Sequence, residues 1–161
     1  MYLRLWGTRG SVPTPVAGNT RYGGNTPCIE VRPDDDLLLI LDAGIGLHWL
    51  GTHLMANSFG SGRGTANIFV SHTHWGHIQG IPFFHPMLIS GNRFSIYGSG
   101  SKDGRSFNKL LIEQMKPEYC PVPNFFDVNI GALTTIEEIG ECGLEGRGTD
   151  EQQFVLGSTR V

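Results

Sequence analysis

The sequence lacks the features that mark secreted, membrane and nucleic-acid-binding chains. It has three cysteines in 161 residues and no C-x-x-C pair, which argues against a disulfide-stapled fold and fits a reducing cytoplasm. The longest purely aliphatic run is Leu37–Leu41, and the N-terminus has no apolar signal-peptide core. We therefore expect neither a membrane span nor a secretion signal. Because no block of basic residues is present, we also expect no strong nucleic-acid-binding patch.

What the chain does have is glycine and a moderate hydrophobic content. Glycine occurs 23 times, about twice its usual ~7% share, which is typical of short strands joined by tight turns. Hydrophobic residues make up 39%, enough for one globular domain over residues 1–161. The net charge is −3, and the acidic residues are concentrated after Phe126. We read this acidic part as a solvated surface.

The hydrophobic pattern predicts strands and helices in a mixed order. Residues 2–6 alternate like a first strand, and a Gly/Pro-rich stretch to residue 25 follows, which at this length indicates a functional or disordered loop. The remaining predicted elements are a hairpin of strands at 27–31 and 37–41, a helix at 45–56, strands at 66–70 and 93–97, a helix at about 107–115 and a strand at 128–136. This order predicts an α/β or α+β fold with layered sheets.

Three of the six histidines lie in residues 71–77, directly after the apolar strand 66–70. Loops at strand ends commonly carry function. Neutral imidazole is the commonest protein metal ligand, so His72, His74 and His77 predict a metal site. We place His48 and His53, on the helix at 45–56, at the protein surface.

Asp42 follows the aliphatic strand 37–41 directly, where a buried carboxylate needs partners. Two roles remain open from the residues alone. It either caps the helix that follows, or it serves the chemistry at the strand ends. The aspartates at 34–36 are read differently, as turn formers in the hairpin loop.

Several segments together resemble the metallo-beta-lactamase superfamily, in particular its phosphodiesterase and RNase Z-like branch. They occur in that family's order and cover most of the chain: residues 6–13, 22–28, 41–44, 71–77 and 78–84, with weaker likeness at 114–115 and 121–123. The family signature at the strand end is His-x-His-x-Asp-His.

The resemblance implies a particular fold and site. The fold would be an α+β type, the αββα sandwich, with two metal ions at one edge. By position, His72 and His74 match ligands of the first metal, and His77 matches a ligand of the second. Asp42 matches a carboxylate that supports the histidine loop from outside the metal shell. The metals would be zinc, or manganese or iron, and the substrate a small anion or phosphodiester, such as a cyclic nucleotide or RNA-like molecule.

The chain departs from the family pattern at two places. Gly76 stands where the family has the aspartate that binds the second metal, and no histidine follows His85. Asp150 is a candidate bridging carboxylate, but it lacks the flanking histidine motif. We therefore expect the sandwich to be incomplete at its C-terminus, metal binding to be weak, and the open sheet to favour a homodimer.

Three functional hypotheses follow. In the first, the chain is a metal-dependent, cytoplasmic phosphodiester hydrolase whose activity is weakened or lost, because a catalytic zinc usually needs three protein ligands. In the second, the chain is a non-catalytic domain that uses the same scaffold to bind a ligand or partner. In the third, it has a structural metal or no ligand at all.

Overall fold

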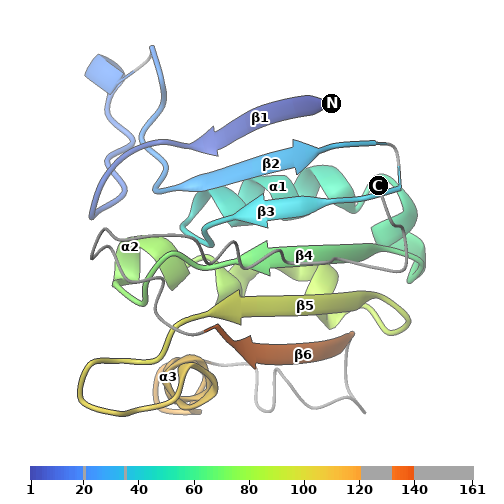
Figure 1. Cartoon of the computed structure of the whole chain (residues 1–161). Coiled ribbons are helices and arrows are strands. Elements are labelled where there is room, and N and C mark those ends of the chain that lie inside the picture. The colour runs from blue at the N-terminus through green and yellow to red at the C-terminus, as the bar shows by residue number, and fades with distance from the viewer. Residues whose placement is uncertain (20, 35, 121–131, 140–161) are drawn as a thin grey trace, which may run out of the picture.

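The computed structural model describes residues 1–19, 21–34, 36–120 and 132–139, and within these ranges it has one six-stranded sheet with helices (Figure 1). The strands are β1 (Tyr2–Gly7), β2 (Cys28–Arg32), β3 (Leu39–Leu41), β4 (Thr65–Phe69), β5 (Arg93–Gly98) and β6 (Leu133–Glu138). The α-helices are α1 (Gly46–Leu54), α2 (Trp75–Ile78) and α3 (Phe107–Gln114). Short 3-10 helices are η1 (Ala17–Asn19), η2 (Ser58–Ser61), η3 (Ile81–Phe83) and η4 (His85–Leu88).

The mixed α+β class expected from the sequence is confirmed, and the elements differ from expectation mainly at their ends. The strand expected at 128–136 is observed as β6, which begins at Leu133 and extends to Glu138, while residues 121–131 lie outside the described part of the chain. The hairpin turn is also as expected, because the carboxylate of Asp34 accepts hydrogen bonds from the backbone N–H groups of Asp36 and Leu37.

The strands lie side by side in chain order, β1 to β6. The pairs β1/β2 and β2/β3 are antiparallel, whereas β3/β4, β4/β5 and β5/β6 are parallel. It follows that β1, β3, β4, β5 and β6 all end at the same edge of the sheet, where Figure 1 shows α2. In sheets with parallel strands, ligands bind beyond the carboxyl ends of the strands, so this edge is where a site is expected.

One face of the sheet is covered by α1, which lies behind the sheet in Figure 1. Alternate residues of the central strands point to this face and are buried, because successive side chains of a strand point to opposite sides. The core on this face includes Cys28, Ile40, Ala66, Ile68, Phe94 and Ile96 from the sheet and Leu47, Leu50 and Leu54 from α1. Gly46 packs closely on Cys28, since a Cβ at Gly46 would lie 2.9 Å from the Cβ of Cys28.

The other face of the sheet carries an apolar row that spans five strands. Its members are paired in register across the sheet: Leu5, Ile29, Leu41, Phe69 and Tyr97. They lie one residue away from the buried core positions and therefore point away from α1. Leu5 remains 54% exposed and Leu41 38% exposed. Such a row is a surface on which another layer could pack.

None of the helices in the described ranges has the length and hydropathy needed to cross a lipid bilayer.

Candidate functional site

The predicted site residues meet at the sheet edge where the parallel strands end. Asp42 follows β3 directly, and the histidine stretch follows the neighbouring strand β4 through Val70 and Ser71. The backbone joins these two connections, because the N–H of Asp42 donates to Phe69 O (2.8 Å) and that of Ala43 donates to His77 O (2.9 Å). The strand register therefore brings together residues about thirty positions apart in the sequence.

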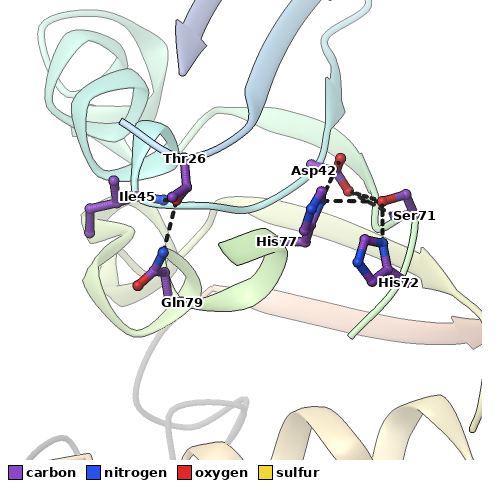
Figure 2. A network of polar contacts seen from close by, with 7 residues as sticks. All are labelled: Thr26, Asp42, Ile45, Ser71, His72, His77 and Gln79. Atoms are coloured by element: carbon purple, nitrogen blue, oxygen red, sulfur yellow. Dashed lines mark hydrogen bonds and ion pairs between the residues drawn. The ribbon is translucent and has the colours of Figure 1, made fainter. Parts of the chain in front are cut away.

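Asp42 has an unusual backbone conformation that fits a functional role. Its φ is +62°, in the left-handed region that few residues other than glycine adopt. Strain of this kind is kept where the surroundings enforce it, often at functional sites. The alternative that Asp42 caps α1 is wrong, because the residue at the cap position of α1 is Ile45 and no side chain caps that end. The carboxylate of Asp42 instead points to the histidine stretch (Figure 2).

The Asp42 carboxylate contacts this stretch at three points. Oδ1 accepts from the Ser71 backbone N–H (2.8 Å) and from the Ser71 hydroxyl (2.7 Å), and Oδ2 lies 2.9 Å from His77 Nδ1. The same His77 nitrogen lies 3.3 Å from the Ser71 hydroxyl oxygen. An ionised carboxylate can only accept, so the His77 proton is on Nδ1. In the neutral ring, Nε2 of His77 then keeps a free lone pair.

Ser71 determines in the same way which nitrogen of His72 carries the proton. A hydroxyl has one proton to donate, and that of Ser71 goes to Asp42. At 3.1 Å, the Ser71 oxygen therefore accepts from His72 Nδ1, which leaves Nε2 of His72 with its lone pair as well. We call Asp42, Ser71, His72, His74 and His77 the histidine cluster. The sequence analysis assigned no role to Ser71, although this residue directly precedes the first histidine of the motif.

The three imidazoles of the histidine cluster are in contact. The His72 ring centroid lies 4.0 Å from that of His77 and 4.6 Å from that of His74. The pKa of His72 is lowered from its usual value, first by desolvation and then by His77 and His74, while Asp42 opposes the shift. A lowered pKa favours the neutral ring, which is the form that binds metals.

The fit of this cluster to a metal ion is incomplete. Neutral imidazoles with Nδ1 held by a carboxylate or hydroxyl have the right donor chemistry for zinc. However, the histidine, cysteine, aspartate and glutamate side chains that the structure describes include no group of three or more placed to hold one ion. The described residues therefore do not fit a complete metal centre. Asp150, the candidate bridging carboxylate, lies outside the described ranges.

The chain matches no family model, no curated protein and no solved structure.

Gly76 is tightly enclosed where the family pattern has aspartate. A Cβ at this position would lie 2.9 Å from the carbonyl oxygen of Ser11, in the loop that follows β1. Ser11 itself has φ +60°, so this part of the loop is also in the left-handed region. The Gly76 carbonyl oxygen would in turn clash with a Cβ at Gly44, and the Gly44 carbonyl oxygen with one at Gly80. A side chain at 76 therefore requires the β1–β2 loop to move.

A second polar network holds the turn before α1 (Figure 2). The buried hydroxyl of Thr26 accepts from the Ile45 backbone N–H (2.7 Å) and from the side chain of Gln79 (2.9 Å). This network ties the β3–α1 turn to the residue that follows α2. No local pattern predicts this network, because Thr26 and Gln79 are 53 residues apart.

The other histidines lie outside the histidine cluster, as expected for His48 and His53. His48 is half-buried with Nδ1 3.2 Å from Phe83 O, and His53 is exposed beside the ring of Trp6. His85 is exposed and contacts the ring of His48 at 5.5 Å between centroids. Cys28 is buried, and burial first, then Glu30 and Asp42, raise the pKa of its thiol, so it stays protonated and is a poor ligand.

Proposed function

We propose that this chain is a metal-dependent hydrolase of the metallo-beta-lactamase type, acting on phosphodiesters, with activity that is weakened or lost. The observation that carries the proposal is the Asp42–Ser71 arrangement, which fixes Nδ1 as the protonated nitrogen of both His72 and His77. Fixing the proton on one nitrogen is how proteins prepare the other for a metal. Zinc is the proposed ion, with manganese or iron as alternatives.

The incomplete ligand set supports the weakened form of this activity. Catalytic zinc sites generally have three protein ligands, and the described residues bring no such group to one point. Gly76 adds no side chain where the family pattern has a carboxylate. We therefore expect weak metal binding and slow turnover rather than efficient hydrolysis.

We also propose that the sheet is one half of an αββα sandwich. Support comes from the apolar row of Leu5, Ile29, Leu41, Phe69 and Tyr97, which points away from α1. Two sheets that pack face to face bury such rows between them. The same face offers a surface for a homodimer, in which the second sheet would come from another copy of the chain.

Turnover of bis(4-nitrophenyl) phosphate with added zinc, manganese or iron tests the activity. We expect slow hydrolysis that saturates with metal and is lost in His72→Asn. His53→Asn is the matched control, because His53 is an exposed histidine on α1 outside the histidine cluster. Equal rates in wild type and His72→Asn would show that the cluster does not carry the activity.

The second candidate function is a non-catalytic ligand- or partner-binding domain on the same scaffold. It is favoured by Gly76 and by the absence, among the described residues, of a three-donor group. Metal binding measured by mass spectrometry of metal content, without turnover under any metal, would favour this candidate. Hydrolysis that depends on both metal and His72 would exclude it.

A further inference from the structure

The loop between β1 and β2 forms a pocket of about 450 Å³. It is lined by Thr8, Arg9, Arg21 and Tyr22, together with three glycines at positions 10, 18 and 23. Pockets for small ligands commonly measure about 300–1,000 Å³, so the size is adequate for a small molecule. We call it the Arg9–Arg21 pocket.

The backbone of this loop is held together at its base. The N–H groups of Thr8 and Arg9 both donate to Asn25 O, at 3.1 and 2.9 Å, and that of Thr14 donates to Gly24 O at 2.9 Å. Gly24 has no room for a Cβ, because it packs directly on the Thr14 carbonyl. The two arms of the loop therefore lie against each other and give the pocket a fixed base.

The residues that line the pocket carry positive charge only. They include two arginines and no acidic residue. Arg9 donates from Nε to the Thr14 hydroxyl (3.0 Å), and Arg21 lies over the ring of Tyr22 with its Cζ 5.0 Å from the centroid. Within the described ranges, neither arginine forms an ion pair with a carboxylate. Guanidinium groups pair with phosphate oxygens through two parallel hydrogen bonds, so this lining suits a phosphate.

The pocket also lies at the functional edge of the sheet. β1 ends at the same edge as β3 and β4, which deliver Asp42 and the histidines. Ser11, next to the pocket residue Gly10, packs on Gly76 of α2. The loop that builds the pocket thus touches the helix that carries His77.

We propose that the Arg9–Arg21 pocket is an anion site that binds a phosphate group of a phosphate-bearing ligand. The further statement that this ligand is the substrate, held by a phosphate that does not react, rests on the proposed function. Binding in the pocket requires only the two arginines and does not depend on a metal.

Calorimetric titration of metal-free protein with inorganic pyrophosphate tests the site. We expect saturable binding of one pyrophosphate per chain. The double variant Arg9→Gln/Arg21→Gln should weaken this binding at least about tenfold, because each of its two substitutions removes a charged hydrogen-bonding partner. The matched control is Arg63→Gln/Arg93→Gln, which removes the same charge from two exposed arginines outside the pocket.

A second variant, Gly18→Glu, tests the pocket without changing either arginine, and Gly18→Ala is its matched control. A Cβ at Gly18 would meet nothing within 4 Å, so neither Gly18→Glu nor Gly18→Ala introduces a clash at its Cβ. We expect Gly18→Glu to weaken pyrophosphate binding by repelling it, and Gly18→Ala to bind like wild type. Circular dichroism checks that each variant is folded.

The outcomes separate this site from the proposed function. The proposed anion site is overturned if the two arginine double variants bind pyrophosphate with equal affinity. It is also overturned if wild type shows no saturable binding of pyrophosphate. Both results count whether or not hydrolysis is observed. If the protein binds pyrophosphate through the arginines but has no phosphodiesterase activity, the anion site is supported. Only the proposed hydrolase function is then contradicted. Binding that is unchanged in His72→Asn, where hydrolysis is lost, supports both.

Discussion

Asp42→Asn is the substitution that isolates the role of the carboxylate in the histidine cluster. Asparagine has the same shape as aspartate and also tolerates the left-handed backbone that Asp42 adopts, with φ +62°. Its oxygen can still accept both hydrogen bonds from Ser71. At the place of Oδ2, however, it presents an NH₂ group, which donates to His77 rather than accepting from it.

The loss of stability follows from the two hydrogen bonds that the carboxylate accepts from Ser71 and from its 2.9 Å contact with His77 Nδ1. Hydrogen bonds to charged groups contribute about 1.5–3 kcal/mol and neutral ones about 0.5–1.5 kcal/mol. The asparagine weakens the two bonds from Ser71 and places a donor against His77, while the Asp42 and His77 side chains are 18% and 20% exposed. Allowing for this solvent access, we expect a loss of about 1–2 kcal/mol in the free energy of unfolding. For a chain of this length that lowers the melting temperature by roughly 2–8 °C.

The substitution should also reverse the tautomer of His77. In wild type the proton is on Nδ1, and in Asp42→Asn it should move to Nε2, because Nδ1 must then accept from the amide. Nitrogen-15 NMR of the imidazole rings distinguishes the two tautomers, and urea unfolding gives the stability. Asp36→Asn, at the hairpin turn, is the control for loss of one negative charge. An unchanged His77 tautomer together with unchanged stability would refute this account of Asp42.

Two further predictions concern packing. Gly76→Ala should destabilise the protein by about 1–3 kcal/mol in urea unfolding, because its Cβ would lie 2.9 Å from Ser11 O, whereas Gly10→Ala has open space and should keep a free energy of unfolding near that of wild type. Gly76→Asp places a Cβ at the same point, so equal stability of Gly76→Asp and wild type would contradict the predicted clash with Ser11. Leu41→Glu should abolish concentration-dependent self-association in sedimentation experiments, because it puts a charge into the apolar row. Trp49→Gln, another exposed apolar side chain, should leave self-association unchanged, and a wild type that is monomeric at all concentrations would disprove association through this face.

The sequence predicted the local elements well because their signals are local. The strand before the histidines, the helix after Asp42 and the hairpin turn at Asp34 each follow from periodicity or turn chemistry within a short window.

The arrangement of the site was harder to predict because it depends on strand register. The sequence left Asp42 with two roles, and the parallel pairing of β3 with β4 decided between them by placing it beside Ser71 and His77. The sequence marked the Gly/Pro-rich stretch before residue 25 as a functional or disordered loop, but it did not predict the Arg9–Arg21 pocket within it. Arginines twelve residues apart in a glycine-rich loop come together only because the arms of that loop pack on each other.

The glycine contacts behind the histidine cluster have a mechanical consequence. Backbone touches backbone from Ser11 to Gly76, from Gly76 to Gly44 and from Gly44 to Gly80, with no side chain between them to absorb a displacement. Close-packed groups of this kind transmit strain rather than deform. A ligand that shifts the β1–β2 loop would therefore push α2, which carries His77, and the β3–α1 turn, which carries Asp42, as one unit, so that the contact between these two side chains is kept while the pair moves.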